Sequence, residues 1–384
     1  MQSKDLDGGS VNALLVNGPN FIAGSQGGYA NIFAGVFLSA DSGRTWKHIS
    51  IGISYFPFYT LGASGNYLFG GFESGIMRSQ DNGESWMQVK SGLHGGRFAV
   101  SGSNIYSATN NGVYRSSDNG DNWTQTNNGI PTENTIALLV NGATIFAATD
   151  TGLFISSNNG DDWTRVNNGA SDGYYMCLGK SGTRLFAGTR EHGLFRSLDS
   201  GVTWVQIKQG LTNEYISAFA DHENRLFVGT VHGVFQSSDN GDSWTEVNSG
   251  FYEPAIPMVQ ALVAIGGNLF AGTYGSGLWM RPLSEIIPVS LSPHNISGSS
   301  GFSGIRGSLL RLGESIEIRV DRPGMVDLGI YDTKGARVST LLHTRMSPGN
   351  HRVALGQDVL STGLYFLRFV SDGITHSQAF LAEK

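Results

Sequence analysis

Ser237-Ser238-Asp239-Asn240-Gly241-Asp242-Ser243-Trp244 is the stretch that decides the fold, because its pattern Ser-x-Asp-x-Gly-x-(Thr/Ser)-Trp returns along the chain. Earlier copies occupy residues 39–46, 79–86, 116–123, 156–163 and 197–204. Successive tryptophans are separated by 40, 37, 40, 41 and 40 residues. A period in this range is typical of propellers and solenoids.

Each copy, called a Trp-ended turn from here on, is expected to be a tight hairpin between two strands. The side chain of Asp239 can accept hydrogen bonds from backbone N–H groups of its own turn, and Gly241 supplies a positive φ that a Cβ would resist. Trp244 is then free to bury its ring between neighbouring sheets. The fourth copy has Asn158 in place of the Asp. Because an amide oxygen can also cap such a turn, we expect no loss of fold there.

A fixed order of strands surrounds each Trp-ended turn. In the fourth unit three apolar runs precede the turn and one strand leads out of it, at residues 135–140, 145–148, 152–155 and 163–166. Four antiparallel strands per ~40 residues are typical of one blade of a β-propeller. The sequence therefore predicts one blade for each repeat.

The last unit differs, because it has three apolar runs, 259–263, 269–273 and 277–280, but no Trp-ended turn and no outer strand. Alignment of the units places Leu6 at the position that follows an outer strand elsewhere. We therefore expect seven blades, the last of them incomplete and closed by three strands plus a few of residues 2–6. The N-terminal segment has no apolar signal core, so we expect the natural chain to begin further upstream.

Beyond Pro282 the pattern changes to a Ser-, Gly- and Pro-rich stretch and then to alternating strands between residues 315 and 381. Short strands at this spacing predict a small β-sandwich. The predicted fold is thus all-β, a seven-bladed β-propeller followed by a small β-sandwich. The expected division is a propeller at 1–283, a linker and first edge of the tail domain at 284–311, and the β-sandwich at 312–384.

The 384 residues carry a formal net charge of −6, which is unevenly shared. Residues 1–284 hold 15 Lys and Arg against 22 Asp and Glu, whereas residues 285–384 hold 10 against 9. An acidic body lacks the basic patch that nucleic-acid binding needs. No apolar run reaches the ~18 residues of a membrane helix. The single Cys177 excludes an intramolecular disulfide and is expected to be a buried, inert thiol.

The repeated turns resemble the Asp-box (BNR) repeat of sialidase-like, sortilin-like and xyloglucanase-like propellers and of photosystem II assembly factors. The resemblance covers residues 1–283. In those families the box is a structural device, so it implies the fold and no particular activity.

The tail resembles the type A C-terminal sorting domain of the type IX secretion system. The resemblance is carried by VDLGIYD at 326–332, PGNH at 348–351, STGLYF at 361–366 and the closing AFLAEK at 379–384. Leu355 replaces an aromatic residue of the family, which is a mild departure. The resemblance implies export through an outer membrane, with the secretion machinery as a partner.

Chemistry is expected on the face opposite the Trp-ended turns. That face bears the turns between second and third strands and the crossings to the next blade, and the resemblance implies that enzymes of this architecture use it. These loops contribute aromatic and basic side chains that suit a ligand pocket: Tyr174, Tyr215, Tyr252, Tyr274, Arg97 and Arg190. A rim of ordinary solvated turn residues is the alternative.

Two histidines occupy matching positions in consecutive units. His192 and His232 each directly precede the Gly that opens a third strand. Two imidazoles with Glu191 could hold zinc or a similar divalent metal and activate water. Because surface histidines are common, a solvated pair without metal is the alternative.

Four carboxylates in the same loops are candidates for catalysis: Glu133, Asp172, Glu214 and Glu253. Glycoside hydrolysis needs two of them about 5–9.5 Å apart, and the sequence does not pair them. Only Arg97 and Arg190 reach this face, and the Phe/Tyr-Arg-Ile-Pro signature of true sialidases is absent. Sialidase activity is therefore not expected.

These observations predict an exported protein, secreted or at the cell surface, whose propeller binds an extracellular small molecule or glycan opposite the Trp-ended turns. The alternative is a hydrolase on the same face. It would be either metal-assisted on phosphoesters, esters or lactones through His192 and His232, or a glycoside hydrolase with a carboxylate pair. Nucleic acid is not an expected partner, and a purely structural surface protein is the third reading.

Overall fold

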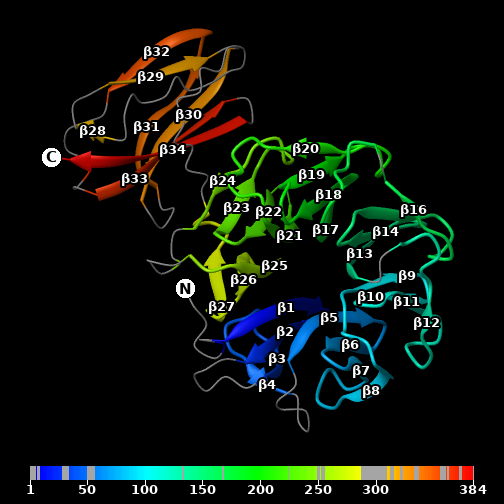
Figure 1. Cartoon of the computed structure of the whole chain (residues 1–384). Coiled ribbons are helices and arrows are strands. Elements are labelled where there is room, and N and C mark those ends of the chain that lie inside the picture. Colours follow the sequence, from blue (N-terminus) through cyan, green and yellow to red (C-terminus); the bar gives the residue numbers. More distant parts are fainter. Residues whose placement is uncertain are drawn as a thin grey trace. The chain divides into compact units, whose positions relative to one another are not determined.

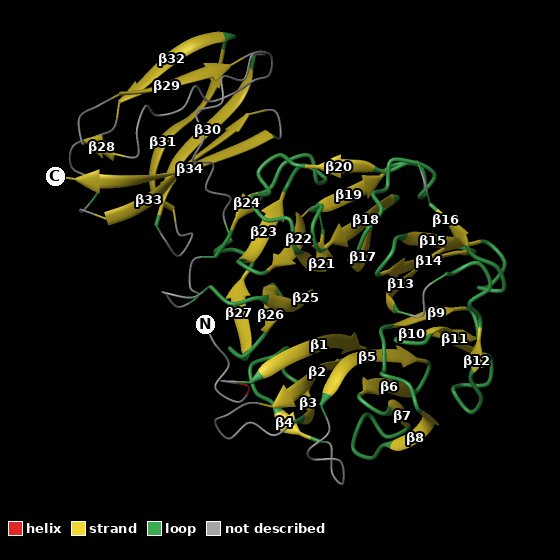
Figure 2. Cartoon of the chain, in the orientation of Figure 1, coloured by secondary structure: helices red, strands yellow, loops and turns green. Residues whose placement is uncertain are grey.

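Figure 1 shows the computed structural model of the chain. The structure describes residues 6, 9–27, 34–49, 57–131, 134–166, 168–223, 225–248, 251, 256–286, 309–311, 315–320, 323–332, 337–354, 360, 363–371 and 374–383. The chain divides into two compact units, Met1–Pro282 and Leu283–Lys384. Apart from one helical residue, Leu6, the regular structure of the described ranges is β-strand (Figure 2), so the predicted all-β class is confirmed. Most of the predicted linker lies outside the described residues.

In the first unit each sheet consists of consecutive strands, paired antiparallel in chain order. Six sheets of the described residues have four strands and the last has three. The first strands are β1 (Ser10–Asn17), β5 (Phe58–Ser64), β9 (Phe98–Ser101), β13 (Thr135–Asn141), β17 (Tyr175–Ser181), β21 (Ile216–His222) and β25 (Val259–Ile265). The second strands are β2 (Asn20–Gly27), β6 (Tyr67–Phe72), β10 (Asn104–Thr109), β14 (Thr144–Thr149), β18 (Arg184–Thr189), β22 (Arg225–Thr230) and β26 (Asn268–Thr273).

The third and outer strands flank the Trp-ended turns. The third strands are β3 (Gly35–Ser39), β7 (Gly75–Ser79), β11 (Gly112–Ser116), β15 (Leu153–Ser156), β19 (Leu194–Ser197), β23 (Gly233–Ser237) and β27 (Leu278–Pro282). The outer strands are β4 (Lys47–His48), β8 (Met87–Ser91), β12 (Thr124–Gln125), β16 (Thr164–Arg165), β20 (Val205–Ile207) and β24 (Thr245–Glu246). The first strand of each sheet contacts the first strand of the next, and β25 contacts β1. The sheets therefore fan around a common centre, with the first strands nearest to it (Figure 1).

The Trp-ended turns are held by side chains of the repeated pattern. The Ser39 hydroxyl donates to Asp41 Oδ1 at 2.8 Å and accepts from the backbone N–H of Gly43 at 2.8 Å. The backbone N–H and the hydroxyl of Thr45 donate to the two Asp41 oxygens at 2.9 and 2.7 Å. Because these bonds favour the ionised form, the pKa of Asp41 falls to about 2.

Gly43 has the expected positive φ, 86°, but the residue before it, Ser42, is also left-handed at 59°. The same holds in every copy, where Asn or Ser stands at this position: Asn82, Asn119, Asn159, Ser200 and Asn240. Asn adopts this conformation more readily than most residues with a Cβ. The pattern therefore fixes two left-handed residues in each turn, one more than predicted.

The fourth turn keeps its geometry although Asn158 replaces the Asp. Asn158 Oδ1 accepts from the Ser156 hydroxyl at 2.9 Å and from the backbone N–H of Asp162 at 3.0 Å. Its amide donates to Asp162 Oδ2 at 2.8 Å. Here the carboxylate and its donor have exchanged places between the third and seventh positions, which explains why the turn is retained.

Apolar clusters lie between consecutive sheets. Trp163 is 4% exposed and packs with Tyr106 of the third sheet and Phe154 of its own. Leu6 is fully buried in a cluster that joins Phe21 of the first sheet to Phe270 of the last. Leu6 therefore helps to bring these two sheets together, while the predicted closing segment before it lies outside the described residues.

Arginines on third strands also link neighbouring sheets. Arg78 donates to the Asn119 carbonyl and to Asp121 Oδ1, both at 2.7 Å, in the Trp-ended turn of the next sheet. Arg115 and Arg196 each make the corresponding two bonds to the Trp-ended turn of the sheet that follows their own. Arg115 donates to the Asn159 carbonyl and Asp161, and Arg196 donates to the Asn240 carbonyl and Asp242. These cross-sheet bonds were not predicted from the sequence.

The second unit contains two sheets that share one core. The larger has the order β28-β34-β33-β30-β31 and the smaller pairs β29 with β32. Their bounds are β28 (Leu309–Arg311), β29 (Ser315–Val320), β30 (Gly324–Tyr331), β31 (Arg337–Met346), β32 (Gly349–Ala354), β33 (Gly363–Ser371) and β34 (Ile374–Glu383). Ile318 and Val353 of the smaller sheet pack in one cluster with Leu328 and Phe369 of the larger.

Candidate functional site

Strand pairing places the predicted site loops at the end of each sheet away from the Trp-ended turns. In the fifth sheet, Leu185 pairs with Ser197, where the Trp-ended turn begins. At the other end of the same strand pair, Gly188 is opposite Leu194, and the turn at 190–193 connects them. The turn that carries Arg190 and His192 therefore lies at the opposite end from the Trp-ended turn.

Tyr174 and Tyr215 stand at matching positions, each directly before the first strand of its sheet. The Asn134 amide donates to the Tyr174 hydroxyl at 3.4 Å. The guanidinium of Arg190 lies over the Tyr174 ring, 5.6 Å from its centroid. The Arg190 backbone N–H also donates to the Tyr174 carbonyl at 2.9 Å, which fixes the turn beside the tyrosine.

Arg97 belongs to the third sheet but reaches the sixth, where its guanidinium donates to the Ser217 carbonyl at 3.3 Å. Its own carbonyl accepts from Ala108 at 2.9 Å. In the six other sheets the residue at this register position is small: Ala13, Thr60, Ala137, Cys177, Ala218 and Ala261. Arg97 is therefore the exception at a repeated structural position.

The backbone before Arg97 approaches the second strand so closely that only glycine fits. A Cβ on Gly96 would lie 0.9 Å from the Ala108 carbonyl oxygen, and one on Gly95 would lie 2.3 Å from the Cα of Gly71. The Thr60 hydroxyl donates to the Gly96 carbonyl at 2.7 Å. The glycine pair thus fixes the backbone position from which the Arg97 side chain extends.

Tyr215 joins these residues into one cluster. Burial raises the pKa of its phenol, while the positive charges of Arg190 and Arg97 act in the opposite direction and the Tyr174 phenol adds to the rise. The Tyr215 backbone N–H donates to Asn213 Oδ1 at 2.9 Å. Four of the six predicted ligand-binding residues are thus within range of one another's charges and are here called the Arg/Tyr cluster: Arg97, Tyr174, Arg190 and Tyr215.

The other two predicted ligand-binding residues are not part of this cluster. Tyr274 is 62% exposed, and its backbone N–H donates to the Met258 carbonyl at 2.9 Å in the last sheet. Tyr252 lies outside the described residues.

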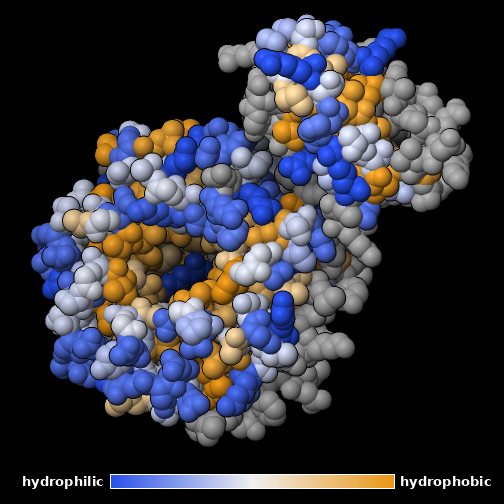
Figure 3. Space-filling view, turned by 180° about the vertical axis from the view of Figure 1, so that it is seen from behind, coloured by the Kyte–Doolittle hydropathy of each residue, from blue (hydrophilic) through white to orange (hydrophobic). Residues whose placement is uncertain are grey.

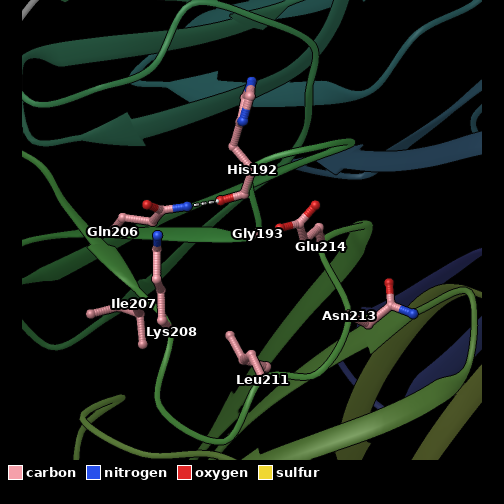
Figure 4. Close-up of a pocket in the computed structure, with 8 residues that line it drawn as sticks. All are labelled: His192, Gly193, Gln206, Ile207, Lys208, Leu211, Asn213 and Glu214. Atoms are coloured by element: carbon pink, nitrogen blue, oxygen red, sulfur yellow. Dashed lines mark hydrogen bonds between the residues drawn. The ribbon is translucent and has the colours of Figure 1, made fainter.

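Figure 4 shows a small depression whose lining includes His192 and Glu214, close in sequence to Arg190 and Tyr215. Its volume is about 130 Å³, below the ~300 Å³ at which ligand pockets usually begin. The residues that line it are His192, Gly193, Gln206, Ile207, Lys208, Leu211, Asn213 and Glu214. The Gln206 amide donates to the His192 carbonyl at 2.7 Å, and the Gly193 N–H donates to the Glu214 carbonyl at 2.9 Å.

The predicted metal ligands do not form a metal group in the described part of the chain. No set of three or more His, Cys, Asp or Glu residues there could hold an ion. His192 lines the small depression, whereas His232 Nδ1 lies 2.7 Å from the Asn213 amide nitrogen. Glu191 is exposed.

The four candidate catalytic carboxylates are not gathered either. Asp172 is 89% exposed and forms an ion pair with Arg165 at 2.8 Å. Glu214 is exposed at the edge of the small depression. Glu133 and Glu253 lie outside the described residues.

Cys177 is buried near the cluster, where its thiol lies 3.7 Å from the Ile216 carbonyl. Burial raises the pKa of this thiol to about 11, despite the nearby charge of Arg97. A thiol with this pKa is protonated at neutral pH and is a poor nucleophile.

The centre of the first unit is hollowed on the side shown in Figure 3, with hydrophobic side chains around the hollow and hydrophilic ones within it. The first strands carry apolar side chains that are only partly buried, among them Leu14, Leu61, Leu139 and Leu178. An apolar wall around a few polar groups is the usual composition of a ligand site.

Comparison with known proteins supports the fold. A family model described as a DUF6242 beta propeller domain matches residues 93–213. YCF48 bound to D1 peptide is 16% identical with a TM-score of 0.55, over 73% of this chain and 95% of that one. The Niastella koreensis GH74 enzyme is 18% identical with a TM-score of 0.52, over 75% of this chain and 44% of that one.

The first unit is a β-propeller. PorZ, described as a surface component of the type-IX secretion system of Porphyromonas gingivalis, is 14% identical to the chain with a TM-score of 0.56. That match covers 98% of this chain and 59% of PorZ. At these identities the likeness shows the fold alone. No curated protein matches the chain, and no described helix is long and apolar enough to span a membrane.

Proposed function

We propose that the chain is an exported binding protein whose propeller holds an extracellular ligand at the Arg/Tyr cluster. Arg97 is the observation that carries the proposal. It is the one large, charged side chain at a register position that is otherwise small, and it extends from the third sheet to Ser217 of the sixth. A chain that needed only to pack its blades would keep a small residue there.

The same proposal includes the finer architecture. The seven sheets of the first unit are taken as the blades of one closed propeller with Asp-box turns, and the second unit as a β-sandwich sorting domain of the type IX system. The contact of β25 with β1 supports the closed ring. The core shared by Ile318 and Phe369 supports the sandwich. The likeness to PorZ agrees with a surface location.

Binding can be tested with immobilised glycans and peptides, followed by calorimetry on any hit. We expect the full chain to bind without turnover and Arg97→Ala to lose binding while its melting temperature shows that it is folded. A hit that Arg97→Ala binds as tightly as the parent would place the ligand elsewhere.

Export can be tested separately in a bacterium that has a type IX system. The full chain behind a signal peptide should appear outside the outer membrane. Removal of residues 374–384, which include β34, should leave it in the periplasm. Equal export of both forms would contradict the sorting role.

A hydrolase remains the second candidate, because His192 and Glu214 line one depression. Chromogenic esters, phosphoesters and glycosides test it directly. Turnover that is lost in both His192→Ala and Glu214→Gln would favour it over simple binding, and turnover that depends on added zinc would favour its metal-assisted form.

A further inference from the structure

The larger sheet of the second unit packs on the shared core with one face only. Val326, Leu328 and Ile330 of β30 belong to that core, so the residues that alternate with them lie on the other face. Strand pairing places residues of the neighbouring strands β31 and β33 on the same face. On these three strands this face, here called the basic face, carries the following titratable side chains: Asp327, Arg337, His343, Arg345 and Arg368.

Positive charge is in excess on the basic face. Asp327 is the one carboxylate that these three strands place there, and Arg337 and His343 already contact it, at 2.7 and 3.1 Å. Because Arg337 compensates the charge of Asp327, the charges of Arg345 and Arg368 remain. Both of these arginines are exposed.

Two of the guanidiniums lie around a single gap in the sheet surface. Arg368 is directly opposite Gly329 in the strand pairing, and a Cβ on Gly329 would lie 2.7 Å from Arg337 Nε. The guanidinium carbons of Arg337 and Arg368 are each 5.8 Å from the centroid of the Tyr331 ring. The ring stabilises both cations, but like charges at one place still repel each other. An anion bound between them would remove that repulsion.

Apolar side chains are interspersed with these charges. Met325 is 52% exposed, and Phe366 and Val370 of β33 are only partly buried. Protein surfaces that bind membranes combine apolar side chains, which enter the boundary between headgroups and acyl chains, with basic side chains that attract anionic lipids. Arginine suits this position because its planar guanidinium pairs with phosphate through two hydrogen bonds. A soluble anion would need the charges alone.

We propose that the basic face is a docking surface for a membrane with anionic phospholipid headgroups, whose phosphates pair with Arg345, Arg368 and Arg337 while Met325 enters the boundary below them. The site is in the second unit and does not depend on a ligand of the Arg/Tyr cluster. The chain as a whole has a net charge of −6. Charges more than ~8–10 Å from the membrane are screened at physiological salt, so the local face decides and the total charge does not.

Co-sedimentation of the full chain with vesicles of phosphatidylcholine, with and without phosphatidylglycerol, tests the inference. We expect binding only when phosphatidylglycerol is present, and a loss of binding as salt is added. Arg345→Gln and Arg368→Gln should each weaken binding by about five-fold, and Met325→Ser should weaken it as well. Arg352→Gln is the matched control, because Arg352 is exposed on the smaller sheet beside the core residue Val353. It removes the same charge on the other side of the core and should bind as the parent does.

Several results would overturn the proposal. Equal binding to both kinds of vesicle, no binding to either, or an equal loss in Arg352→Gln would show that the basic face does not recognise anionic lipid. Binding of polyglutamate that depends on Arg368, without vesicle binding, would indicate an acidic protein partner instead. Vesicle binding that Met325→Ser leaves unchanged and that inorganic phosphate abolishes would reduce the face to a site for a soluble anion. Melting temperatures show whether each variant is folded, and if Arg368→Gln melts early, Arg345→Gln decides.

Discussion

Replacement of Arg78 by Met is the sharpest test of how the blades are held together. The Arg78 side chain is 6% exposed and crosses to the next sheet, where it bonds to the Asn119 carbonyl and Asp121. It also lies 5.0 Å from the centroid of the Tyr67 ring. Met keeps the apolar stem and removes only the guanidinium, so the change removes the cross-sheet bonds and the contact with Tyr67 and leaves the apolar packing in place.

The expected cost follows from these contacts. Hydrogen bonds to charged groups contribute about 1.5–3 kcal/mol, and a cation over an aromatic ring about 0.5–2 kcal/mol. Two terms reduce the sum: Asp121 is 63% exposed, so water screens its half of the pair, and Arg78 Nε is buried without a described partner. We therefore expect Arg78→Met to lower the free energy of unfolding of the propeller by about 2 kcal/mol.

The repeat provides an internal comparison. Arg115 makes the same two bonds one sheet later, but its side chain is 26% exposed. Screening is stronger there, so Arg115→Met should cost about 1 kcal/mol. Urea unfolding of the three proteins, followed by tryptophan fluorescence, measures both values. If Arg115→Met costs as much as Arg78→Met, burial does not set the strength of these bonds and the reasoning is refuted.

Three further predictions concern the turns and the buried thiol. Trp163→Ala should cost about 3–5 kcal/mol of stability in thermal unfolding, because the indole is almost fully buried between sheets; a cost below 1 kcal/mol would contradict this packing. The pKa of Asp81 is lowered from 3.8 to about 2, mainly by Ser85, so its stabilising effect should be complete above pH 4 and lost as the pH falls towards 2. Asp81→Asn should be less stable than the parent at pH 7 and lose less in that range. Cys177, with a thiol pKa raised to about 11 by burial, should not react with a chromogenic disulfide at pH 7 until the protein unfolds; rapid reaction of the folded protein would show an accessible thiol.

The strands and turns could be predicted because the information is local and repeated. Each Trp-ended turn contains its own hydrogen-bond donors and acceptors, as Ser39 and Asp41 illustrate, and six copies confirm one another. The cross-sheet arginines could not be predicted, since Arg78 and Asp121 are 43 residues apart and meet only when two sheets pack. Between the fourth and fifth sheets the corresponding positions are occupied by the uncharged residues Ile155 and Val202, so the pair is not a regular part of the repeat.

The site was predicted as a set of loops and only partly as a cluster. Arg97, Arg190, Tyr174 and Tyr215 were selected by their place in the repeat, but Tyr274 was selected by the same criterion and lies apart. The loop in which a residue lies predicts which end of the sheets it occupies. It does not predict how far its side chain is from those of other loops. An alignment of the first strands by their pairing register would have distinguished Arg97 from the other candidates, because the residues at the same register position in the other sheets are all small.

The glycine pair before Arg97 is needed for the backbone, whereas Arg97 itself is not. The two requirements can therefore be distinguished by comparing homologues. Gly95 and Gly96 are required by the backbone whichever side chain comes next. A homologue that keeps both glycines and changes Arg97 should therefore retain the fold and differ in what it binds at this place. A homologue that has lost Gly96 would need a different entry into this blade, and an arginine at the next position would then be no guide to what it binds.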